Sequence, residues 1–360
     1  MTSDSVIKRW AHPQIQNLSA YAVAPAEGLI KLDAMENPYV WDRELKDAWL
    51  EELRHVSLNR YPDGQALGLA KTLRQVFEVP RPLDILLGNG SDELIQMVSM
   101  TIGGPGRTML APEPSFSMYR VIAAITGSDY VATSRNHDFS IDMDALLDAI
   151  EKHDPCCVFL ANPNNPTGNV CTHDAIDQIA KRCSGIVVVD EAYHAFSGQS
   201  FLDQAPAYDN VVVMRTLSKL GLAGLRLGFL SGHRDVIETL NKVRLPYNIN
   251  SMTQMSVEFA LRHIDWFDEK SRLICEARAT LFESLKKISG ITAYPSAANF
   301  ILFRVPAGAG DSVHADLQRQ GVLVKNLNGA HPLLTDSLRV TVSTPLENAA
   351  FVDALNDALG

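Results

Sequence analysis

Three side chains that could do chemistry together, Asp190, Tyr193 and Lys219, follow two apolar runs of the sequence. The run Ile186–Val189 leads into Asp190, and the run Val211–Met214 is soon followed by Lys219. Short valine-rich runs are typical of strands covered on both faces, as in a parallel sheet, and ligands bind beyond the carboxyl ends of such strands. We therefore expect the carboxylate, the phenol and the amine to converge on one crevice.

This combination of groups is the one that pyridoxal phosphate chemistry requires. A lysine amine, here followed by the apolar Leu220, Leu222 and Ala223, joins the cofactor as a Schiff base. A carboxylate on the adjacent strand holds a proton on the pyridine nitrogen. The sequence therefore predicts a site for pyridoxal 5'-phosphate with Lys219 and Asp190 at its centre.

A glycine-rich turn offers a place for a phosphate. The predicted strand Asp84–Leu87 runs into Gly88–Glu93, which opens a helix. A helix N-terminus presents free backbone N–H groups and the positive end of the dipole, and both suit a phosphate. Ser91 or Asp92 could instead be an ordinary helix cap. The turn is not a dinucleotide fingerprint, because Glu93 occupies the third glycine position.

Two more predicted strands end in residues that can face a ligand. The strand at Thr108–Leu110 leads to Phe116, an aromatic that can lie flat against a heteroaromatic ring or simply pack in the core. The buried strand Cys157–Leu160 stops at Asn162–Gly168, whose Pro, Asn and Gly residues predict a tight turn at the same sheet edge. This turn carries Asn165.

Composition excludes several classes of protein. The formal net charge of -10 argues against a nucleic-acid surface, and no apolar run is long enough for a membrane span or a signal peptide. The five cysteines are odd in number and lack metal-ligand spacing, which indicates reduced thiols in a cytoplasmic protein. Zinc motifs, a P-loop and a hydrolase elbow are absent from the sequence, so we expect no metal.

The order of strands and helices predicts an α/β protein of two domains. Strands and helices alternate from about residue 83 to 232, which is typical of a mainly parallel central sheet flanked by helices, and we assign residues 56–250 to this large domain. Residues 251–360, joined by 29–55, are predicted to form a smaller α+β domain. Residues 1–28 are predicted to be an arm that a neighbouring element orders.

The ordered motifs resemble a known family. Asn165-Pro166-Thr167-Gly168, Asp190-x-x-Tyr193, and Ser218-Lys219 with Arg226 seven residues on are similar to the fold-type-I aminotransferases. Further motifs narrow the resemblance, from about Tyr21 to the C-terminus, to the histidinol-phosphate aminotransferase branch: Tyr61-Pro62-Asp63-Gly64, Gly90-Ser91-Asp92-Glu93, Leu222-Ala223-Gly224-Leu225-Arg226-Leu227-Gly228 and Leu338-Arg339-Val340-Thr341-Val342.

The resemblance implies a role for each cofactor contact. Lys219 would hold the cofactor and shuttle a proton, Asp190 would keep the pyridine nitrogen protonated, and Tyr193 and Asn165 would bond the ring hydroxyl. Phe116, where many relatives have Tyr, would stack on the ring. The phosphate would lie on the N–H groups of Ser91 and Asp92, the Asp92 carboxylate serving as a helix cap, with Thr216, Ser218, Arg226 and, from the partner subunit of a homodimer, Tyr61 around it.

The resemblance also implies how substrates bind. Arg339 would clamp the glutamate carboxylate, and the same region, with Tyr21 and Lys325, would bind the phosphate of histidinol phosphate. Asn165 would also contact the substrate. Many family members have Arg where this chain has Lys325. Without the resemblance, the sequence favours a packing role for Tyr21 over a ligand contact. Arg339 could equally well form a surface ion pair.

The implied reaction is transamination in histidine biosynthesis, which interconverts L-histidinol phosphate and 2-oxoglutarate with imidazole-acetol phosphate and L-glutamate. An aromatic amino acid aminotransferase and a phospho-amino-acid decarboxylase of the same fold remain as alternatives. A ligand-sensing regulator with such a domain is a third, but it needs a basic DNA-binding module, for which the short N-terminal arm leaves no room.

Overall fold

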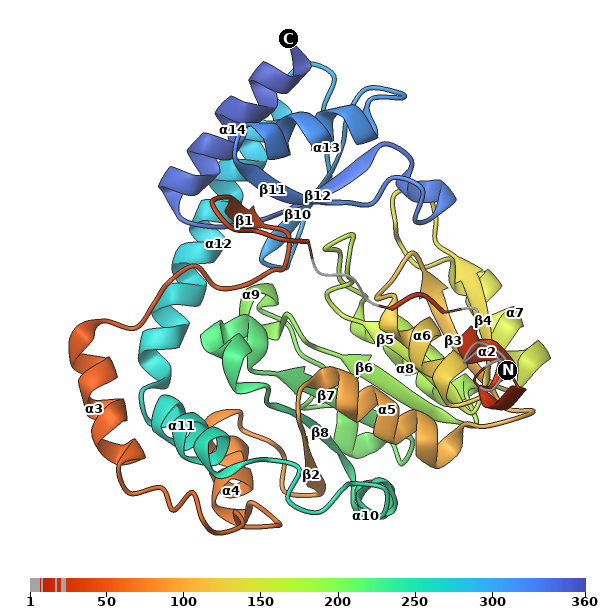
Figure 1. Cartoon of the computed structure of the whole chain (residues 1–360). Coiled ribbons are helices and arrows are strands. Elements are labelled where there is room, and N and C mark those ends of the chain that lie inside the picture. The colour runs from red at the N-terminus through yellow and green to blue at the C-terminus, as the bar shows by residue number, and fades with distance from the viewer. Residues whose placement is uncertain (1–6, 8, 17, 21–23) are drawn as a thin grey trace.

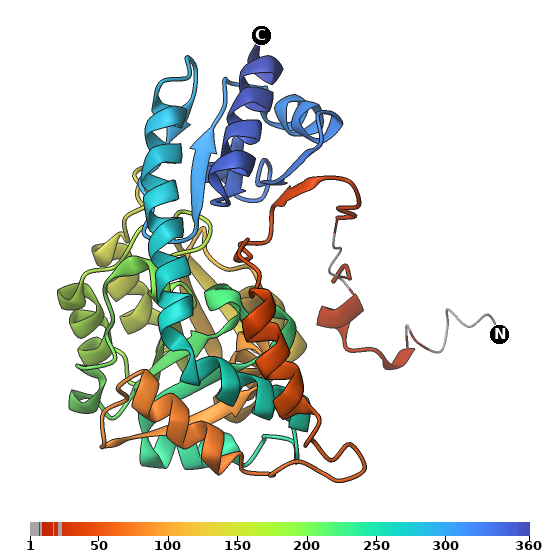
Figure 2. The same ribbon diagram turned by 90° about the vertical axis from the view of Figure 1, so that its left-hand side faces the viewer.

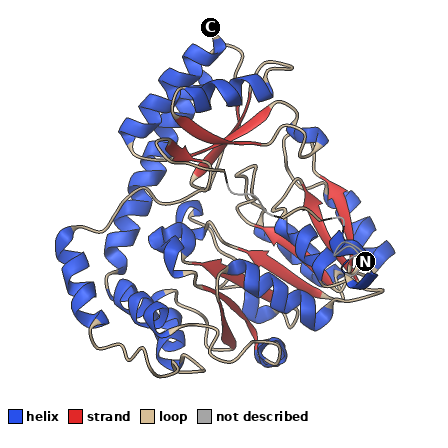
Figure 3. Cartoon of the chain, viewed as in Figure 1, coloured by secondary structure: helices blue, strands red, loops and turns tan. Residues whose placement is uncertain are grey.

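The computed structural model describes residues 7, 9–16, 18–20 and 24–360, and in this part of the chain it shows two sheets (Figures 1 and 3). The larger sheet has seven strands. In spatial order these are β2 (Leu83–Gly88), β8 (Gly228–His233), β7 (Val211–Thr216), β6 (Ile186–Asp190), β5 (Cys157–Ala161), β3 (Thr108–Glu113) and β4 (Asp129–Ser134).

The larger sheet is mainly parallel, as the sequence predicts. Only β8 among its strands runs antiparallel to its neighbours, β2 and β7. Strands β6 and β7 lie side by side with Val187 to Asp190 in register with Val211 to Met214. The residues that follow their carboxyl ends therefore meet at one edge of the sheet.

The valine runs are buried on both faces because successive side chains of a strand point to opposite sides. Val187 and Val189 of β6 belong to the core on one face, whereas Val188 belongs to the core on the other. The first core packs against α4 (Leu67–Val76), α7 (Met143–His153), α8 (His173–Arg182) and α11 (Ser251–Arg262). The second packs against α5 (Ser91–Ile102), α6 (Met118–Ile125) and α10 (Arg234–Asn241).

The smaller sheet has five strands and its own core. Their order is β1 (Ile30–Leu32), β11 (Val322–Asn326), β12 (Ser337–Thr341), β10 (Phe300–Arg304) and β9 (Thr292–Ala293). Side chains of three helices fill that core: α12 (Ile264–Lys286), α13 (Gly310–Arg319) and α14 (Pro345–Leu359). The early strand β1 pairs in parallel with β11, so residues near the start of the chain complete this sheet.

Two helices that we grouped with the small domain pack beside the larger sheet instead. Val257 and Leu261 of α11 lie in the first core of the larger sheet, because α11 contacts α4. Helix α3 (Arg43–Leu53) lies against α11, and Trp49 of α3 donates a hydrogen bond to Ser256. The division into domains stays a prediction, and we propose to move its boundary into the long helix α12, which runs beside both sheets (Figure 2).

The described residues that precede β1 lie outside both cores. In the described part of the predicted arm, the short helix α2 (Pro13–Gln16) contacts α6. Among the described helices, none combines the length and the apolar character that crossing a bilayer requires.

Candidate functional site

Lys219 lies shortly after β7, in the short π-helical turn Ser218–Leu222. Its Nζ donates a hydrogen bond to the carbonyl oxygen of Ala34, 3.1 Å away. Burial, together with the nearby positive charges of Arg339 and Arg226, lowers the pKa of the amine to about 8. A lysine with a lowered pKa is partly neutral near pH 7, and the neutral amine is the nucleophilic form.

Asp190 is the last residue of β6 and is buried. Its Oδ1 accepts a hydrogen bond from the N–H of Ala192 (3.0 Å), and its Oδ2 accepts one from the hydroxyl of Tyr119 (2.6 Å). Burial raises the pKa of this carboxyl to about 6, and the hydrogen bond from Tyr119 is the strongest opposing effect. At neutral pH the carboxylate is therefore mostly ionised.

Tyr193, Asn165 and Arg339 form one hydrogen-bonded chain. The side-chain amide of Asn165 donates to the Tyr193 hydroxyl (3.2 Å), and its oxygen accepts from Nη1 of Arg339. Nη2 of Arg339 donates to the carbonyl oxygen of Asp33 (2.8 Å). These bonds join the turn after β5, the end of β6 and strand β12, so they bring the larger sheet and the smaller sheet to one site.

The predicted phosphate cradle is formed where α5 begins. Ser91 and Asp92 are the first two residues of α5, so their backbone N–H groups have no partner within the helix. At the end of β7, the hydroxyl of Thr216 lies 3.1 Å from the hydroxyl of Ser218, which also accepts a hydrogen bond from Arg226 (3.2 Å). This end of the crevice therefore offers hydroxyls, free N–H groups and a guanidinium.

The predicted capping role of the Asp92 side chain is wrong. The residue that caps α5 is Gly90, which has no side chain, and Asp92 lies in the first turn. Within the described structure its buried Oδ1 has no hydrogen-bond partner. Burial raises the pKa of this carboxyl, against the opposing effect of Arg226 and Lys219. The alternative in which Ser91 caps the helix is also wrong, because Gly90 occupies that position and no side chain forms the cap bond.

Every predicted cofactor contact except Tyr61 lines a single cavity. Its walls also include Met35, Ala161, Pro163 and Ala192. The predicted residues in it are Ser91, Asp92, Phe116, Asn165, Asp190, Tyr193, Thr216, Ser218, Lys219 and Arg226.

A second cavity shares Phe116 and Lys219 with the first and holds the predicted substrate contacts Lys325 and Arg339. These two residues are paired across the antiparallel strands β11 and β12, so their side chains lie on the same face of the smaller sheet. The side chains of Lys325 and Arg339 therefore place two positive charges on one wall of a cavity that Lys219 also lines.

Two predicted residues are not in these cavities. Tyr61 is 80% exposed, and its ring stacks on Tyr247 with 4.4 Å between the ring centroids. Tyr21 lies outside the described residues.

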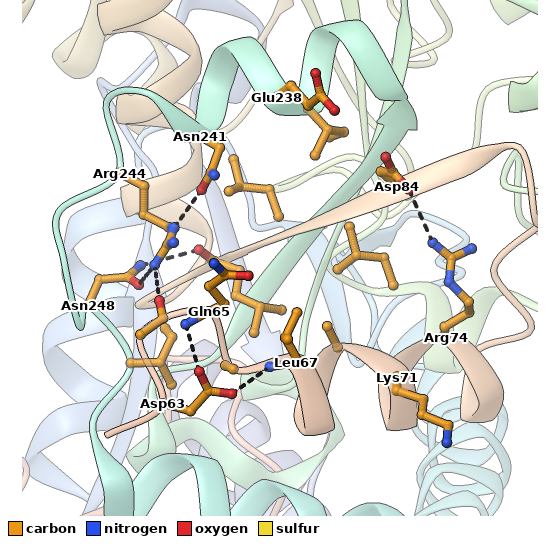
Figure 4. A pocket seen from close by; sticks show the side chains of 18 residues that line it. Asp63, Gln65, Leu67, Lys71, Arg74, Asp84, Glu238, Asn241, Arg244 and Asn248 are labelled. Carbon is orange, nitrogen blue, oxygen red and sulfur yellow. Dashed lines mark hydrogen bonds and ion pairs between the residues drawn. The ribbon is translucent and has the colours of Figure 1, made fainter. Parts of the chain in front are cut away.

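A third cavity lies beside the Tyr61 segment, between α4, β2 and α10 (Figure 4). Its polar side chains largely bind one another: Arg244 donates to the carbonyl of Gly64 and to Asn248, and Asn248 donates to Glu93 of α5. This network connects the segment after Tyr61 to the first turn of α5. None of the predicted site residues lines this cavity.

Sequence reasoning missed Tyr119 and the carbonyl of Ala34. Tyr119 follows Phe116 by one helical turn, and its spacing from a strand end is a signal that we could have used. The hydrogen bond from Lys219 to the carbonyl of Ala34 joins residues 185 positions apart, and no local sequence pattern predicts it.

Comparisons with known proteins agree with this arrangement. The family model for class I and II aminotransferases matches residues 27–355. A histidinol-phosphate aminotransferase 2 of Nitrosococcus oceani is 54% identical, over 99% of this chain and 98% of the relative. A histidinol-phosphate aminotransferase of Chromobacterium violaceum is 45% identical, over 97% of this chain and 98% of the relative.

A crystal structure of another protein has the same fold as this chain. The histidinol-phosphate aminotransferase from Sinorhizobium meliloti, solved in complex with pyridoxal-5'-phosphate, superposes with a TM-score of 0.88 over 99% of both chains at 22% identity. The predicted α/β fold and the predicted family are therefore confirmed. This chain belongs to the class I and II aminotransferases.

Proposed function

We propose that this protein is a pyridoxal-phosphate-dependent transaminase that interconverts L-histidinol phosphate and 2-oxoglutarate with imidazole-acetol phosphate and L-glutamate, in histidine biosynthesis. The names of relatives that are 54% and 45% identical over nearly the whole chain support this reaction. The structural observation that carries the proposal is the cavity in which Lys219 adjoins the two cations Lys325 and Arg339.

The residues at the site fit pyridoxal phosphate. A buried carboxylate, a lysine with a lowered pKa and an anion cradle line one cavity, which matches the pyridine nitrogen, the aldehyde and the phosphate of the cofactor. The backbone at Gly90 makes room for the cradle, because a Cβ at this position would lie 2.5 Å from Nη2 of Arg226. Ser91, Thr216, Ser218 and Arg226 would hold the phosphate.

Lys219 carries the proton transfers of the reaction. Pyridoxal phosphate, when bound, supplies an aldehyde that condenses with amines and a ring that withdraws electrons from the substrate Cα. The amine of Lys219, whose pKa is about 8, can accept a proton and return it near neutral pH. A positioned group of this kind typically accelerates a reaction by about 10²–10⁴-fold.

Asp190, Tyr193 and Asn165 orient the ring. The ionised carboxylate of Asp190 would hold a proton on the pyridine nitrogen. The hydroxyl of Tyr193 and the amide of Asn165, which already bind each other, would bond the ring hydroxyl. Phe116, which lines the same cavity, would lie against the ring face.

Arg339 and Lys325 bind the two kinds of substrate anion. The planar guanidinium of Arg339 matches a carboxylate bidentately, which suits glutamate. The phosphate of histidinol phosphate carries more charge, and the adjacent ammonium of Lys325 would add a second cation for it. Tyr21, which lies outside the described residues, stays a predicted contact of the same substrate.

Replacing Lys325 with alanine should separate the two substrates. We expect kcat/KM for histidinol phosphate to fall about 10-fold, because a hydrogen bond to a charged group contributes about 1.5–3 kcal/mol and Lys325 is partly exposed. The value of kcat/KM for glutamate should fall only a little, because Arg339 binds this substrate. Single-turnover kinetics of each half-reaction measure the two effects, with Lys325→Arg as the control that keeps the charge. An equal loss for both substrates would contradict this division of roles.

Replacing Gly90 with alanine should weaken cofactor binding. The residue has φ +90°, which an alanine rarely adopts, and the new Cβ would displace Arg226 from the cradle. We expect the dissociation constant of the apoenzyme for pyridoxal phosphate to rise about 10- to 100-fold. Gly224→Ala is the matched control, because no atom lies within 4 Å of a Cβ built there. The prediction fails if equilibrium titration gives the same constant for both variants.

A panel of substrates tests the proposed reaction as a whole. Steady-state kcat/KM is measured for histidinol phosphate, phenylalanine, tyrosine and a phosphorylated amino acid, with release of carbon dioxide followed for the last. Histidinol phosphate should give the highest value. The proposal is abandoned if an aromatic amino acid exceeds it, or if decarboxylation dominates.

We also propose that the protein is a cytoplasmic homodimer in which Tyr61 reaches the phosphate site of the partner subunit. The exposure of Tyr61 and its absence from the cavity of its own chain support this, because a role at the phosphate site would then require another copy of the chain. All five cysteines are free thiols, which fits a reducing compartment.

A further inference from the structure

Tyr119 makes a direct hydrogen bond to the carboxylate at the centre of the site. It lies in the first turn of α6 and is fully buried. Its hydroxyl donates to Oδ2 of Asp190 at 2.6 Å, while the backbone N–H of Ala192 donates to Oδ1 at 3.0 Å. The two bonds come from different elements, so together they fix the plane of the carboxylate.

The ring of Tyr119 is held from two sides. It stacks on Phe159 of β5, with ring centroids 4.6 Å apart and an angle of 8° between the planes, and it meets Phe116 edge to face at 5.6 Å. Phe116 and Asp190 line the cofactor cavity, but Tyr119 does not. Tyr119 therefore lies behind the cavity wall and can act on the cofactor only through Asp190.

We propose that Tyr119 is a positioning residue that keeps Asp190 ionised and oriented, so that the pyridine nitrogen of the cofactor holds the proton. This inference rests on the proposed use of pyridoxal phosphate. A single proton is shared between the Asp190 carboxyl and the ring nitrogen. Donation from Tyr119 stabilises the carboxylate, which leaves the proton on nitrogen.

Other groups around Asp190 oppose ionisation. Burial and the negative charges of Asp92 on α5 and of Glu191 raise the pKa of the carboxyl, and the buried hydroxyl of Tyr193 lies nearby. Against these, Tyr119 and the N–H of Ala192 are the groups that favour the charged form. Without the Tyr119 hydroxyl, the Asp190 carboxyl would bind the shared proton more strongly. The ring nitrogen would then lose that proton to Asp190.

Tyr119→Phe tests this role because it keeps both ring contacts and removes only the hydroxyl. We expect the dissociation constant of the apoenzyme for pyridoxal phosphate to rise about 10-fold at about pH 6.5. The difference from the unaltered protein should shrink toward about pH 8.5, where Asp190 is ionised in both proteins. Every other titrating group is shared by the two proteins, so their difference isolates the hydroxyl.

Tyr130→Phe is the matched control. Its hydroxyl donates to Glu113 at 2.9 Å, and Tyr130 does not line the cofactor cavity, so this variant should bind the cofactor as the unaltered protein does at each pH. A loss of affinity for pyridoxal phosphate in Tyr119→Phe that is the same at every pH would overturn the proposal. It would indicate that Tyr119 contributes only through packing. If the unaltered protein binds no pyridoxal phosphate at any pH, the proposed function is wrong, and this inference, which rests on it, is wrong as well.

A second measurement serves if Tyr119→Phe does not fold. Fluorotyrosine placed at position 119 is a stronger hydrogen-bond donor with nearly the same shape. At a pH at which the pair holds one proton, the nuclear magnetic resonance signal of an isotopically labelled ring nitrogen in the holoenzyme should then lie closer to its protonated position than in the unaltered protein. An unchanged nitrogen signal would refute the role of Tyr119.

Discussion

Lys219→Ala is expected to abolish turnover. Borohydride, which reduces the Schiff base and so fixes pyridoxal phosphate to the protein, should no longer attach the cofactor to this variant. The variant loses the amine that joins the cofactor, and it loses the acid–base group whose contribution alone is about 10²–10⁴-fold. Mass spectrometry of the reduced protein measures the attachment, and steady-state assays measure the turnover.

A second lysine variant provides the control. Lys242 ends α10 at the surface, so Lys242→Ala should keep both the attachment and the activity. If Lys219→Ala still carries the cofactor after borohydride treatment, a different lysine holds it, and the assignment of the site is wrong.

Asp190→Asn is expected still to bind the cofactor, though more weakly, and to lose most of the turnover. Asparagine has the same shape and can still accept the hydrogen bond from Tyr119, but it has no charge to match a protonated pyridine. Breaking a buried charge pair costs about 3–5 kcal/mol, which corresponds to on the order of 10²–10⁴-fold in kcat.

The measurement is kcat at saturating pyridoxal phosphate, so that any weaker binding does not contribute. Asp42→Asn is a suitable control, because Asp42 is the N-cap of α3 and asparagine is an equally good cap. Full activity in Asp190→Asn would show that the ring nitrogen needs no anionic partner in this enzyme.

Much of the fold could be predicted because local patterns determine it. The valine runs of β6 and β7 are apolar at every position, and the structure buries them on both faces. Asp142 and Thr172 are of residue types that favour the first position of a helix, and each accepts a hydrogen bond from the backbone N–H three residues on. Strand ends then place the predicted cofactor contacts along one edge of the sheet.

The parts that failed depend on contacts between distant segments. The capping role given to Asp92 was wrong because Gly90, with a left-handed φ, ends the turn before it. The place of α11 beside the larger sheet depends on its packing against α4, which no local pattern of the sequence indicates. The bond from Tyr119 to Asp190 spans 71 positions and has no sequence motif.

The hydrogen bond between Arg339 and the carbonyl of Asp33 joins residues 306 positions apart. All of the predicted cofactor contacts lie before residue 227, whereas Lys325 and Arg339 come near the end of the chain. Because a chain is synthesised from its N-terminus, the ribosome makes all of the predicted cofactor contacts before it makes the two predicted substrate cations. Synthesis thus separates in time two halves of a site that catalysis needs together.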